Sequence, residues 1–155
     1  YDLLTIWEHM QFIAQAYGVR DWQPRAKELL ELYELDDKEK KLGRDLSKGM
    51  RQKVSICCAL LPDPQLLFFD EPMIGLDPKA IKNTKMLFKK LKEEGKTILV
   101  STHLIDSVES IADRIMIMKD GKIIGNDTVE NLKIQAASGD GLSLEDLFLE
   151  LTKDE

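Results

Sequence analysis

Long hydrophobic runs are missing from this sequence of 155 residues. The longest apolar stretches, residues 56–61 and 66–69, are far shorter than the ~20 residues that a helix needs to cross a bilayer. The sequence therefore predicts no membrane-spanning helix. Residues 1–8 contain no basic region followed by an apolar run, so we expect no secretory signal, and the sequence does not start with Met.

Cysteine, histidine and net positive charge are also scarce. The two cysteines, Cys57 and Cys58, are neighbours, which excludes a useful structural disulfide and suits a reducing cytoplasm. The two histidines, His9 and His103, do not have the spacing of metal ligands. A formal net charge of −6 argues against a broad nucleic-acid-binding face, which needs clustered Lys and Arg. The content of 43% hydrophobic and 32% charged residues is typical of a folded globular protein.

Residues 1–61 are predicted to form a helical subdomain. A first helix is indicated by apolar residues at helical spacing, Ile6, Met10 and Ile13. Gly18 favours the end of this helix, and a second helix is expected after Pro24. The apolar stripe of the second helix consists of Ala26, Leu29, Leu30 and Tyr33. The charged stretch 36–45 lacks such a pattern and is predicted to be a linker.

Residues 62–127 have the pattern of an α/β fold. Short apolar runs alternate with amphipathic helices, and these runs are residues 66–69, 97–101 and 114–118. This alternation predicts a parallel sheet covered by helices. Asp77 and Pro78 are expected to begin the helix between the first two runs, and Gly95 to end it. The predicted buried face of this helix is Ala80, Thr84, Leu87 and Leu91.

A hairpin and a helical tail are expected in the last part of the chain. Asp120 and Gly121 both tolerate the positive φ of a tight turn, so they predict an antiparallel pair of strands around them. In the tail, residues 128–155, Ser143 and Asp146 have the spacing of a helix start. The apolar face of that helix is predicted to be Leu147, Phe148 and Leu151.

Two carboxylates follow the first apolar strand. A buried strand would bring Asp70 and Glu71 to the carboxyl edge of the sheet, where ligands of open α/β folds bind. In a nucleotide site Asp70 would hold Mg²⁺ through water, and Glu71 would orient and deprotonate the attacking water. The alternative is a strand that simply runs into an acidic turn.

A serine, a lysine and a glycine stand at the beginning of another predicted helix. Ser47 and Gly49 would provide a hydroxyl, close backbone approach and free N–H groups at the positive end of the helix dipole, which together favour an anion. Ser47 acting only as a helix cap is the simpler alternative. His103 follows the strand 97–101 and would hydrogen-bond a terminal phosphate, although a lone histidine is more often structural.

In combination these segments resemble the ATP-binding-cassette (ABC) family over essentially the whole chain. Residues 46–50 are similar to the family's signature motif, 67–70 to its Walker B strand, Glu71 to its catalytic glutamate, 75–77 to its D-loop and His103 to its switch histidine. The resemblance implies ATP and Mg²⁺ as cofactors, with Asp70 as the metal residue. It also implies an incomplete P-loop NTPase fold in which residues 62–127 form part of a RecA-like core.

In this family two ATPase subunits meet head to tail. The resemblance therefore implies that Ser47, Lys48 and Gly49 contact the ATP of a partner subunit and that Asp77 lies at the interface. Residues 1–5 with Glu8, and the segment 144–152, look like ATPase subunits of ABC-2-type exporters. A permease partner and a place on the cytoplasmic face of the cell membrane are then expected, with docking through the helical part. Export substrates in this subfamily are diverse, so none is indicated.

Two departures from the family pattern affect this interpretation. Lys48 stands where the common signature has Gly, and Met50 where it has Gln; a cation at Lys48 is compatible with an anion site. The 155 residues contain no G-x-x-x-x-G-K-S/T loop, and the family's Q-loop glutamine is expected upstream of Tyr1. We therefore expect a truncated chain that is inactive alone.

Two other interpretations remain open at this point. One is a non-transport ABC ATPase that acts on nucleic acid, which the acidic charge disfavours. The other is a non-catalytic module that places its signature motif on the ATP of a complete partner. The presence of Asp70, Glu71 and His103 argues against the second, because such a module would not need them.

Overall fold

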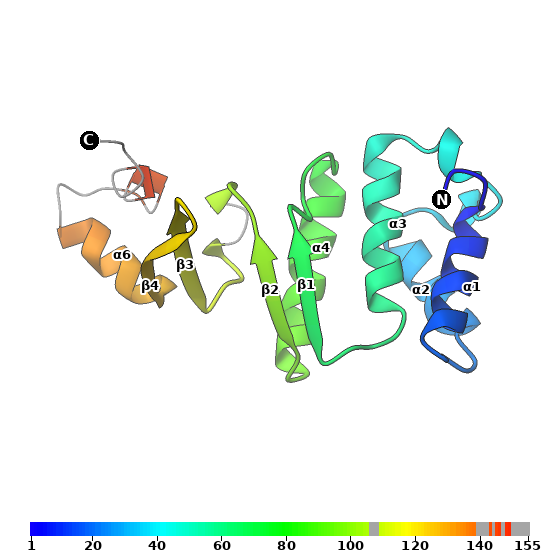
Figure 1. The fold of residues 1–155 in the computed structure, drawn as a ribbon, viewed down its shortest axis with the longest axis horizontal. Helices are drawn as coiled ribbons and strands as arrows, with labels where there is room; N and C mark the ends of the chain where they lie inside the picture. The colour runs from blue at the N-terminus through cyan, green and yellow to red at the C-terminus, as the bar shows by residue number, and fades with distance from the viewer. Residues whose placement is uncertain (106–108, 139–142, 144, 147, 150–155) are drawn as a thin grey trace. The chain divides into compact units, whose positions relative to one another are not determined.

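The computed structural model describes residues 1–105, 109–138, 143, 145–146 and 148–149. The chain forms two compact units, Tyr1–Thr102 and His103–Glu155. The first unit holds a group of helices and a small parallel sheet, and the second holds a hairpin and a helix (Figure 1). None of the described helices is both long and apolar enough to cross a membrane.

The first helix, α1 (Ile6–Ala16), begins at a capping box. The Glu8 N–H donates to Thr5 Oγ1 at 3.2 Å, and the Thr5 N–H donates to Glu8 Oε2 at 2.7 Å. The buried face of α1 consists of Ile6, Met10 and Ala14. Ile13, which indicated the helix by its spacing, is half-buried, and the next residue, Ala14, lies in the buried face.

The second helix, α2 (Gln23–Leu32), carries Pro24 in its first turn as predicted. Its buried residues are Ala26, Leu29 and Leu30, and Tyr33 at its end is buried as well. The predicted linker 36–45 is more ordered than expected. It contains two short 3₁₀ turns, η1 (Asp36–Lys38) and η2 (Gly43–Asp45), and Leu42 forms a bridge with Thr5. This backbone pairing is non-local, so apolar periodicity does not reveal it.

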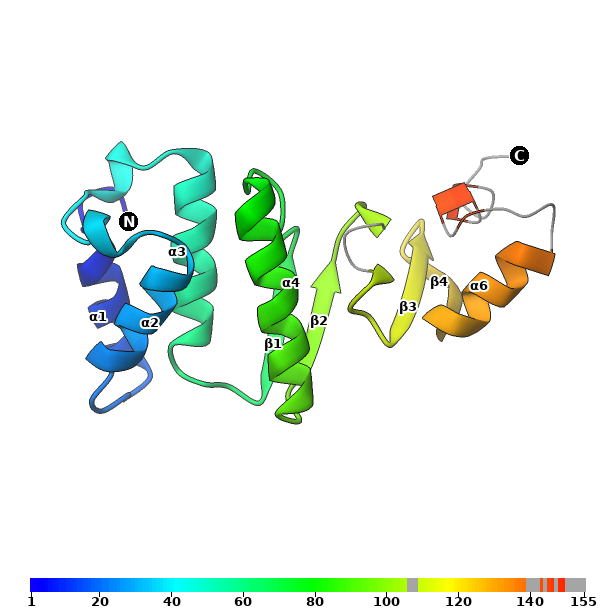
Figure 2. The ribbon, with the colours of Figure 1, turned by 180° about the vertical axis from the view of Figure 1, so that it is seen from behind.

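The third helix, α3 (Lys48–Leu60), packs against α1 and α2. Its buried residues are Val54, Ile56, Cys57 and Leu60, and Leu61 beyond its end is also buried. Both views show α3 between the other two helices, α1 and α2, and the part of the unit that contains the sheet (Figure 2). The predicted helical part thus exists, and α3 brings the segment that starts at Ser47 next to the α/β part.

The sheet of the first unit consists of β1 (Leu66–Asp70) and β2 (Thr97–Ser101), which are parallel. One face is covered by α4 (Pro78–Glu93), and the Phe69 and Phe88 rings stack with centroids 4.9 Å apart (Figures 1 and 2). The buried residues of α4 are Ala80, Thr84, Phe88 and Leu91. The prediction of Leu87 was wrong, because Phe88 is the residue that faces the sheet and Leu87 is half-buried.

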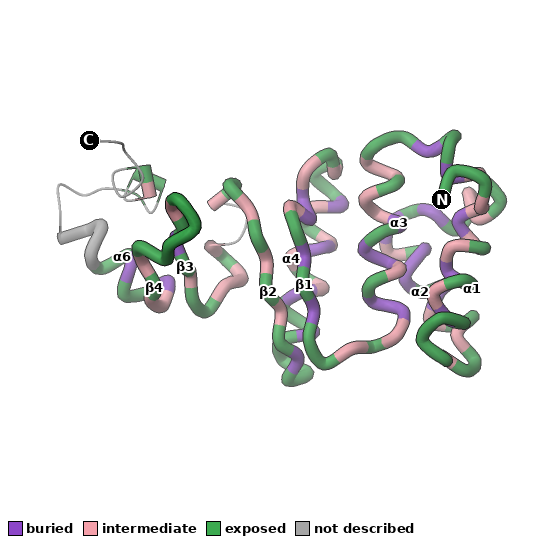
Figure 3. Tube along the Cα trace, in the orientation of Figure 1, coloured by how far each residue is buried: buried purple, intermediate pink, exposed green. Residues whose placement is uncertain are grey.

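The other face of this sheet is apolar and exposed. Leu66, Phe68 and Leu99 are 50%, 67% and 44% exposed, whereas Leu67 and Phe69 on the α4 side are buried (Figure 3). The sequence predicted a parallel sheet covered by helices, without stating which face each helix covers. Successive side chains of a strand point to opposite faces, and among the described elements of this unit α4 covers one of them.

In the second unit, β3 (Arg114–Lys119) and β4 (Lys122–Thr128) form an antiparallel pair. The predicted turn is confirmed, with φ of 50° at Asp120 and 73° at Gly121. The following helix, α6 (Val129–Ser138), contributes the buried residues Val129 and Leu132. The sequence also predicted that β3 belongs to one parallel sheet with β1 and β2. Such a sheet would include strands of both units, so this stays a prediction.

The start of the tail helix has the expected hydrogen bonds. The Asp146 N–H donates to Ser143 Oγ at 3.1 Å, and the Ser143 N–H donates to Asp146 Oδ2 at 3.0 Å. Phe148 is half-buried, while Leu147 and Leu151 lie outside the described residues. The subdivision into residues 1–61, 62–127 and 128–155 also stays a prediction.

Candidate nucleotide site

The carboxyl ends of β1 and β2 bring four polar side chains together. Asp70 is the register partner of Ser101, whose hydroxyl donates a hydrogen bond to Asp70 Oδ1. Thr102 Oγ1 donates to Glu71 Oε2 at 2.7 Å. Asp70 is exposed and Glu71 is half-buried. The structure therefore places both predicted carboxylates at one edge of the sheet, each with a hydroxyl partner from the neighbouring strand end.

The backbone of Glu71 has an unusual conformation. Its φ is +45°, in the left-handed region that residues other than glycine rarely adopt. Its N–H donates to the Ser101 carbonyl at 2.8 Å, which continues the pairing of the two strands by one residue. The next residue, Pro72, is buried. Such conformations persist where the surroundings hold them, and they cluster at functional sites.

Ser47 begins α3 as its N-cap. Its Oγ accepts a hydrogen bond from the Met50 N–H at 3.2 Å, so the capping role considered from the sequence is confirmed. Ser47 is exposed and Lys48 is the first residue of the helix. The N–H groups of a first helical turn have no partner within the helix, and the helix dipole is positive there. This end of α3 therefore has the chemistry of an anion site in addition to its cap.

The beginning of α3 contacts the loop 71–77 that connects β1 to α4. A Cβ added to Gly49 would lie 2.5 Å from the Gly75 carbonyl oxygen. A Cβ added to Gly75, which has a φ of +79°, would lie 3.6 to 3.8 Å from the side-chain carbons of Lys48. Gly49 is thus needed for a close approach between two parts of this chain, whereas the sequence had predicted a close approach of this residue to an anion.

Asp77 caps α4 and also forms an ion pair. Its Oδ1 accepts from the Ala80 N–H at 2.9 Å, and its Oδ2 lies 2.7 Å from Lys53 Nζ. The Lys53 side chain is only 13% exposed. The hydrogen bond from Lys53 is the main reason that the pKa of Asp77 is lowered, and the Ala80 N–H lowers it further. The predicted helix start at Asp77 is confirmed.

Four residues at this site were missed from the sequence. Ser101 and Thr102 meet the carboxylates because β1 and β2 are parallel and in register. Gln52 Nε2 donates to the carbonyl oxygens of Glu71, at 3.4 Å, and Pro72, at 3.2 Å. Gln52 and Lys53 lie one turn after Gly49 on α3, a spacing that could have pointed to them.

His103 is exposed and is the first residue of the second unit. Its predicted contact with the terminal phosphate would place it beside Asp70 and Glu71 of the first unit, and this stays a prediction. The described residues include no group of three or more His, Cys, Asp or Glu that could hold a metal ion. Magnesium is usually held by one or two carboxylates together with water and phosphate oxygens, so the pair Asp70 and Glu71 fits this cation.

Comparisons with known proteins found similar ATP-binding proteins of ABC transporters. The family model described as ABC transporter matches residues 2–74. The ABC-type transporter ATP-binding protein EcsA of Bacillus subtilis is 36% identical, over 100% of this chain and 63% of its own length. The ABC transporter ATP-binding protein YthP of the same organism, described as uncharacterized, is 36% identical over 96% of this chain and 63% of its own length.

The chain belongs to the ABC transporter ATP-binding protein family.

A solved ATP-binding subunit of an ABC transporter has the same fold. It superposes with a TM-score of 0.90 and 36% identity, covering 99% of this chain and 64% of the solved chain. The predicted fold class, part of an ABC ATPase fold, is thereby confirmed. The chain spans 63% of the length of EcsA and 63% of the length of YthP, which is somewhat less than two thirds of each relative. The nucleic-acid and non-catalytic alternatives are not favoured, since these relatives are ATP-binding subunits of transporters.

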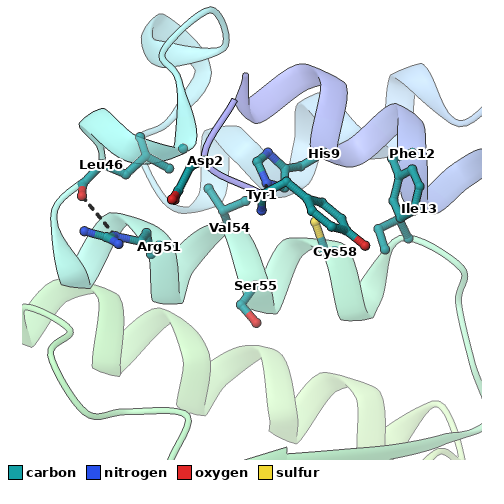
Figure 4. Close-up of a pocket in the computed structure, with 11 residues that line it drawn as sticks. Tyr1, Asp2, His9, Phe12, Ile13, Leu46, Arg51, Val54, Ser55 and Cys58 are labelled. Atoms are coloured by element: carbon teal, nitrogen blue, oxygen red, sulfur yellow. Dashed lines mark hydrogen bonds between the residues drawn. The ribbon is translucent and has the colours of Figure 1, made fainter. Parts of the chain in front are cut away.

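A separate pocket lies between α1 and α3 of this ABC chain (Figure 4). Its volume is about 310 Å³, and it is lined by Tyr1, Asp2, His9, Phe12, Ile13, Gly43, Leu46, Arg51, Val54, Ser55 and Cys58. Arg51 Nε donates to the Leu46 carbonyl at 3.1 Å beside it. None of the carboxylates at the sheet edge lines this pocket. It is therefore distinct from the candidate nucleotide site.

Proposed function

We propose that this chain is part of the nucleotide-binding subunit of an ABC transporter, which couples MgATP binding and hydrolysis to export across a membrane. The observation that carries the proposal is the pair Asp70 and Glu71 at the sheet edge, held by Ser101 and Thr102. Family membership supports the same activity.

In this proposal the two carboxylates have different tasks. Asp70, which is exposed, would help to hold Mg²⁺. Bound Mg²⁺ would neutralise negative charge on the phosphates. Glu71 orients the attacking water and takes its proton, and the hydroxyl of Thr102, 2.7 Å from Glu71 Oε2, keeps the carboxylate directed. His103 is proposed to contact the terminal phosphate of the same nucleotide.

The proposed site needs a second ATPase subunit. Ser47, Lys48 and Gly49 at the beginning of α3 would bind the phosphates of the nucleotide held by that subunit, in a head-to-tail dimer. Asp77 would lie at the same interface. The glycine-rich phosphate loop with its lysine is not among these 155 residues, and in the natural protein we propose that it precedes Tyr1.

The proposed membrane partner is a permease that docks on the helical part of the chain, at the cytoplasmic face of the membrane. Phe12 and Tyr17 on and after α1 are 44% and 70% exposed, which suits such a contact, whereas Met10 is buried. Export as the direction, and the ABC-2 subfamily, are supported by the sequence resemblance at both ends of the chain.

The test is Glu71→Gln in the full natural protein. We expect ATP binding to be retained and steady-state hydrolysis to fall by several orders of magnitude, because the proposed base is removed while shape and size are kept. The control Glu28→Gln removes the same charge from an exposed position on α2 and should hydrolyse ATP at the wild-type rate. Near-normal turnover of Glu71→Gln would refute the role of Glu71.

A further inference from the structure

Gln52 connects α3 to the residue proposed as the base. It lies in the second turn of α3 and is half-buried. Its side-chain amide donates to two consecutive carbonyl groups, Glu71 at 3.4 Å and Pro72 at 3.2 Å. Both of these hydrogen bonds are made to the main chain, so they act on the backbone that carries Glu71.

The backbone at Glu71 needs such support. Its φ of +45° is unfavourable for a residue with a side chain, and a residue that precedes a proline normally prefers an extended conformation. The Glu71 N–H is held by the Ser101 carbonyl, 2.8 Å away on the β2 side. Gln52 holds the carbonyl side from α3. The two peptide groups on either side of the Glu71 Cα are thus held by two different elements of the first unit.

The same face of α3 holds the rest of the loop 71–77. Gly49 is in close contact with Gly75, and Lys53 Nζ lies 2.7 Å from Asp77 Oδ2. The loop is therefore attached to α3 at its beginning, near its middle and at its end.

We propose that Gln52 is a positioning residue that sets the direction of the Glu71 carboxylate by holding the backbone that carries it. The inference rests on the proposed function, since it assumes that Glu71 is the base. A residue that acts on the geometry of the base, without contacting nucleotide, changes kcat and leaves KM for ATP nearly unchanged.

The experiment compares Gln52→Ala and Gln52→Glu in the full natural protein. Gln52→Glu keeps the size of the side chain and replaces the donating NH₂ group by an oxygen, which repels both carbonyls. The control is Gln15→Ala, at an exposed position on α1. Hydrolysis is measured per bound nucleotide, so that a loss of folded protein does not imitate a loss of turnover. We expect kcat to fall about tenfold in both variants, with KM within about twofold of wild type.

A second measurement separates positioning from a general structural role. Gln52→Ala is combined with Glu71→Gln, and single-turnover hydrolysis of radiolabelled ATP is followed. If Gln52 acts through Glu71, the double variant should be no slower than Glu71→Gln alone. The same tenfold loss in both backgrounds would overturn the inference. If Gln52→Ala binds no nucleotide, the same two measurements are made on Gln52→Glu: kcat with KM, and turnover in the Glu71→Gln background.

The outcomes distinguish the inference from the proposed function. If Glu71→Gln abolishes turnover and the Gln52 variants keep wild-type kcat, the proposed function stands and the positioning role of Gln52 is refuted. If Glu71→Gln hydrolyses ATP normally, the role of Glu71 fails and the inference fails with it.

Discussion

A buried hydrogen bond between Tyr33 and Thr84 gives the sharpest prediction about stability. It joins the end of α2 to the middle of α4, with Tyr33 Oη 2.9 Å from Thr84 Oγ1. Thr84 Oγ1 donates to the Ala80 carbonyl at 2.8 Å, so its proton is already used and Tyr33 is the donor. Both residues are buried, and desolvation raises the pKa of Tyr33 far above that of an ordinary phenol. The phenol is therefore protonated at neutral pH.

The cost of removing each partner follows from this geometry. Tyr33→Phe removes one donor and leaves Thr84 bonded to Ala80, so the free energy of unfolding should fall by about 1 kcal/mol. Thr84→Val leaves the buried Tyr33 hydroxyl without its acceptor, which should cost about 2 kcal/mol. In the double variant no hydroxyl is stranded. We expect its cost to be about 1 kcal/mol less than the sum of the single costs.

The assay is denaturant unfolding of the full natural protein and the three variants, with Tyr17→Phe as a control. Tyr17 is 70% exposed, so its hydroxyl should contribute less than about 0.5 kcal/mol. Additive costs for Tyr33→Phe and Thr84→Val would refute the reasoning, because they would show that the two hydroxyls do not interact. A double variant less stable than the sum would refute it as well.

Two further predictions concern the contact of α3 with the loop 71–77. Gly49→Ala should lower the free energy of unfolding by about 1 to 3 kcal/mol, since its Cβ would lie 2.5 Å from the Gly75 oxygen; an unchanged unfolding midpoint would contradict the close contact. Asp77→Asn should be less stable than wild type at pH 6, by less than about 1 kcal/mol because the pair with Lys53 is partly exposed. The folded-state pKa of Asp77 lies below its usual 3.8, so this stabilisation is complete above that value and is lost as the pH falls through the lowered pKa. Unfolding at pH 6 and near pH 2 measures it, and a difference that stays constant would show that ionised Asp77 is not involved.

Local signals in the sequence predicted the ends of elements well. The helix starts at Asp77 and Ser143, the turn at Asp120 and the cap at Ser47 all appear in the structure. Each depends on residues at most three positions apart, so the chemistry is contained in the segment itself. The carboxylates at the end of β1 were predicted for a similar reason, because an apolar strand followed by acids places them at a sheet edge.

The sequence predicted less well which residues of a helix or strand are buried. Leu87 was expected in the buried face of α4, where Phe88 is found instead. The positions three and four residues after a buried helical residue both lie near the same face, and the partner surface decides which of the two is buried. The exposed side of β1, with Phe68 on it, was missed because a continuous apolar run does not tell which faces are covered.

The sequence by itself thus determined the family resemblance, the order of helices and strands, and the residues that carry charge at the proposed site. Only the tertiary structure decided what holds those residues. Thr102 reaches Glu71 because two strands distant in sequence lie in parallel register, and Gln52 and Lys53 reach the loop 71–77 because α3 packs beside it. Caps and turns are set by short-range hydrogen bonding along the chain, whereas these contacts exist only after apolar burial has brought separate elements together.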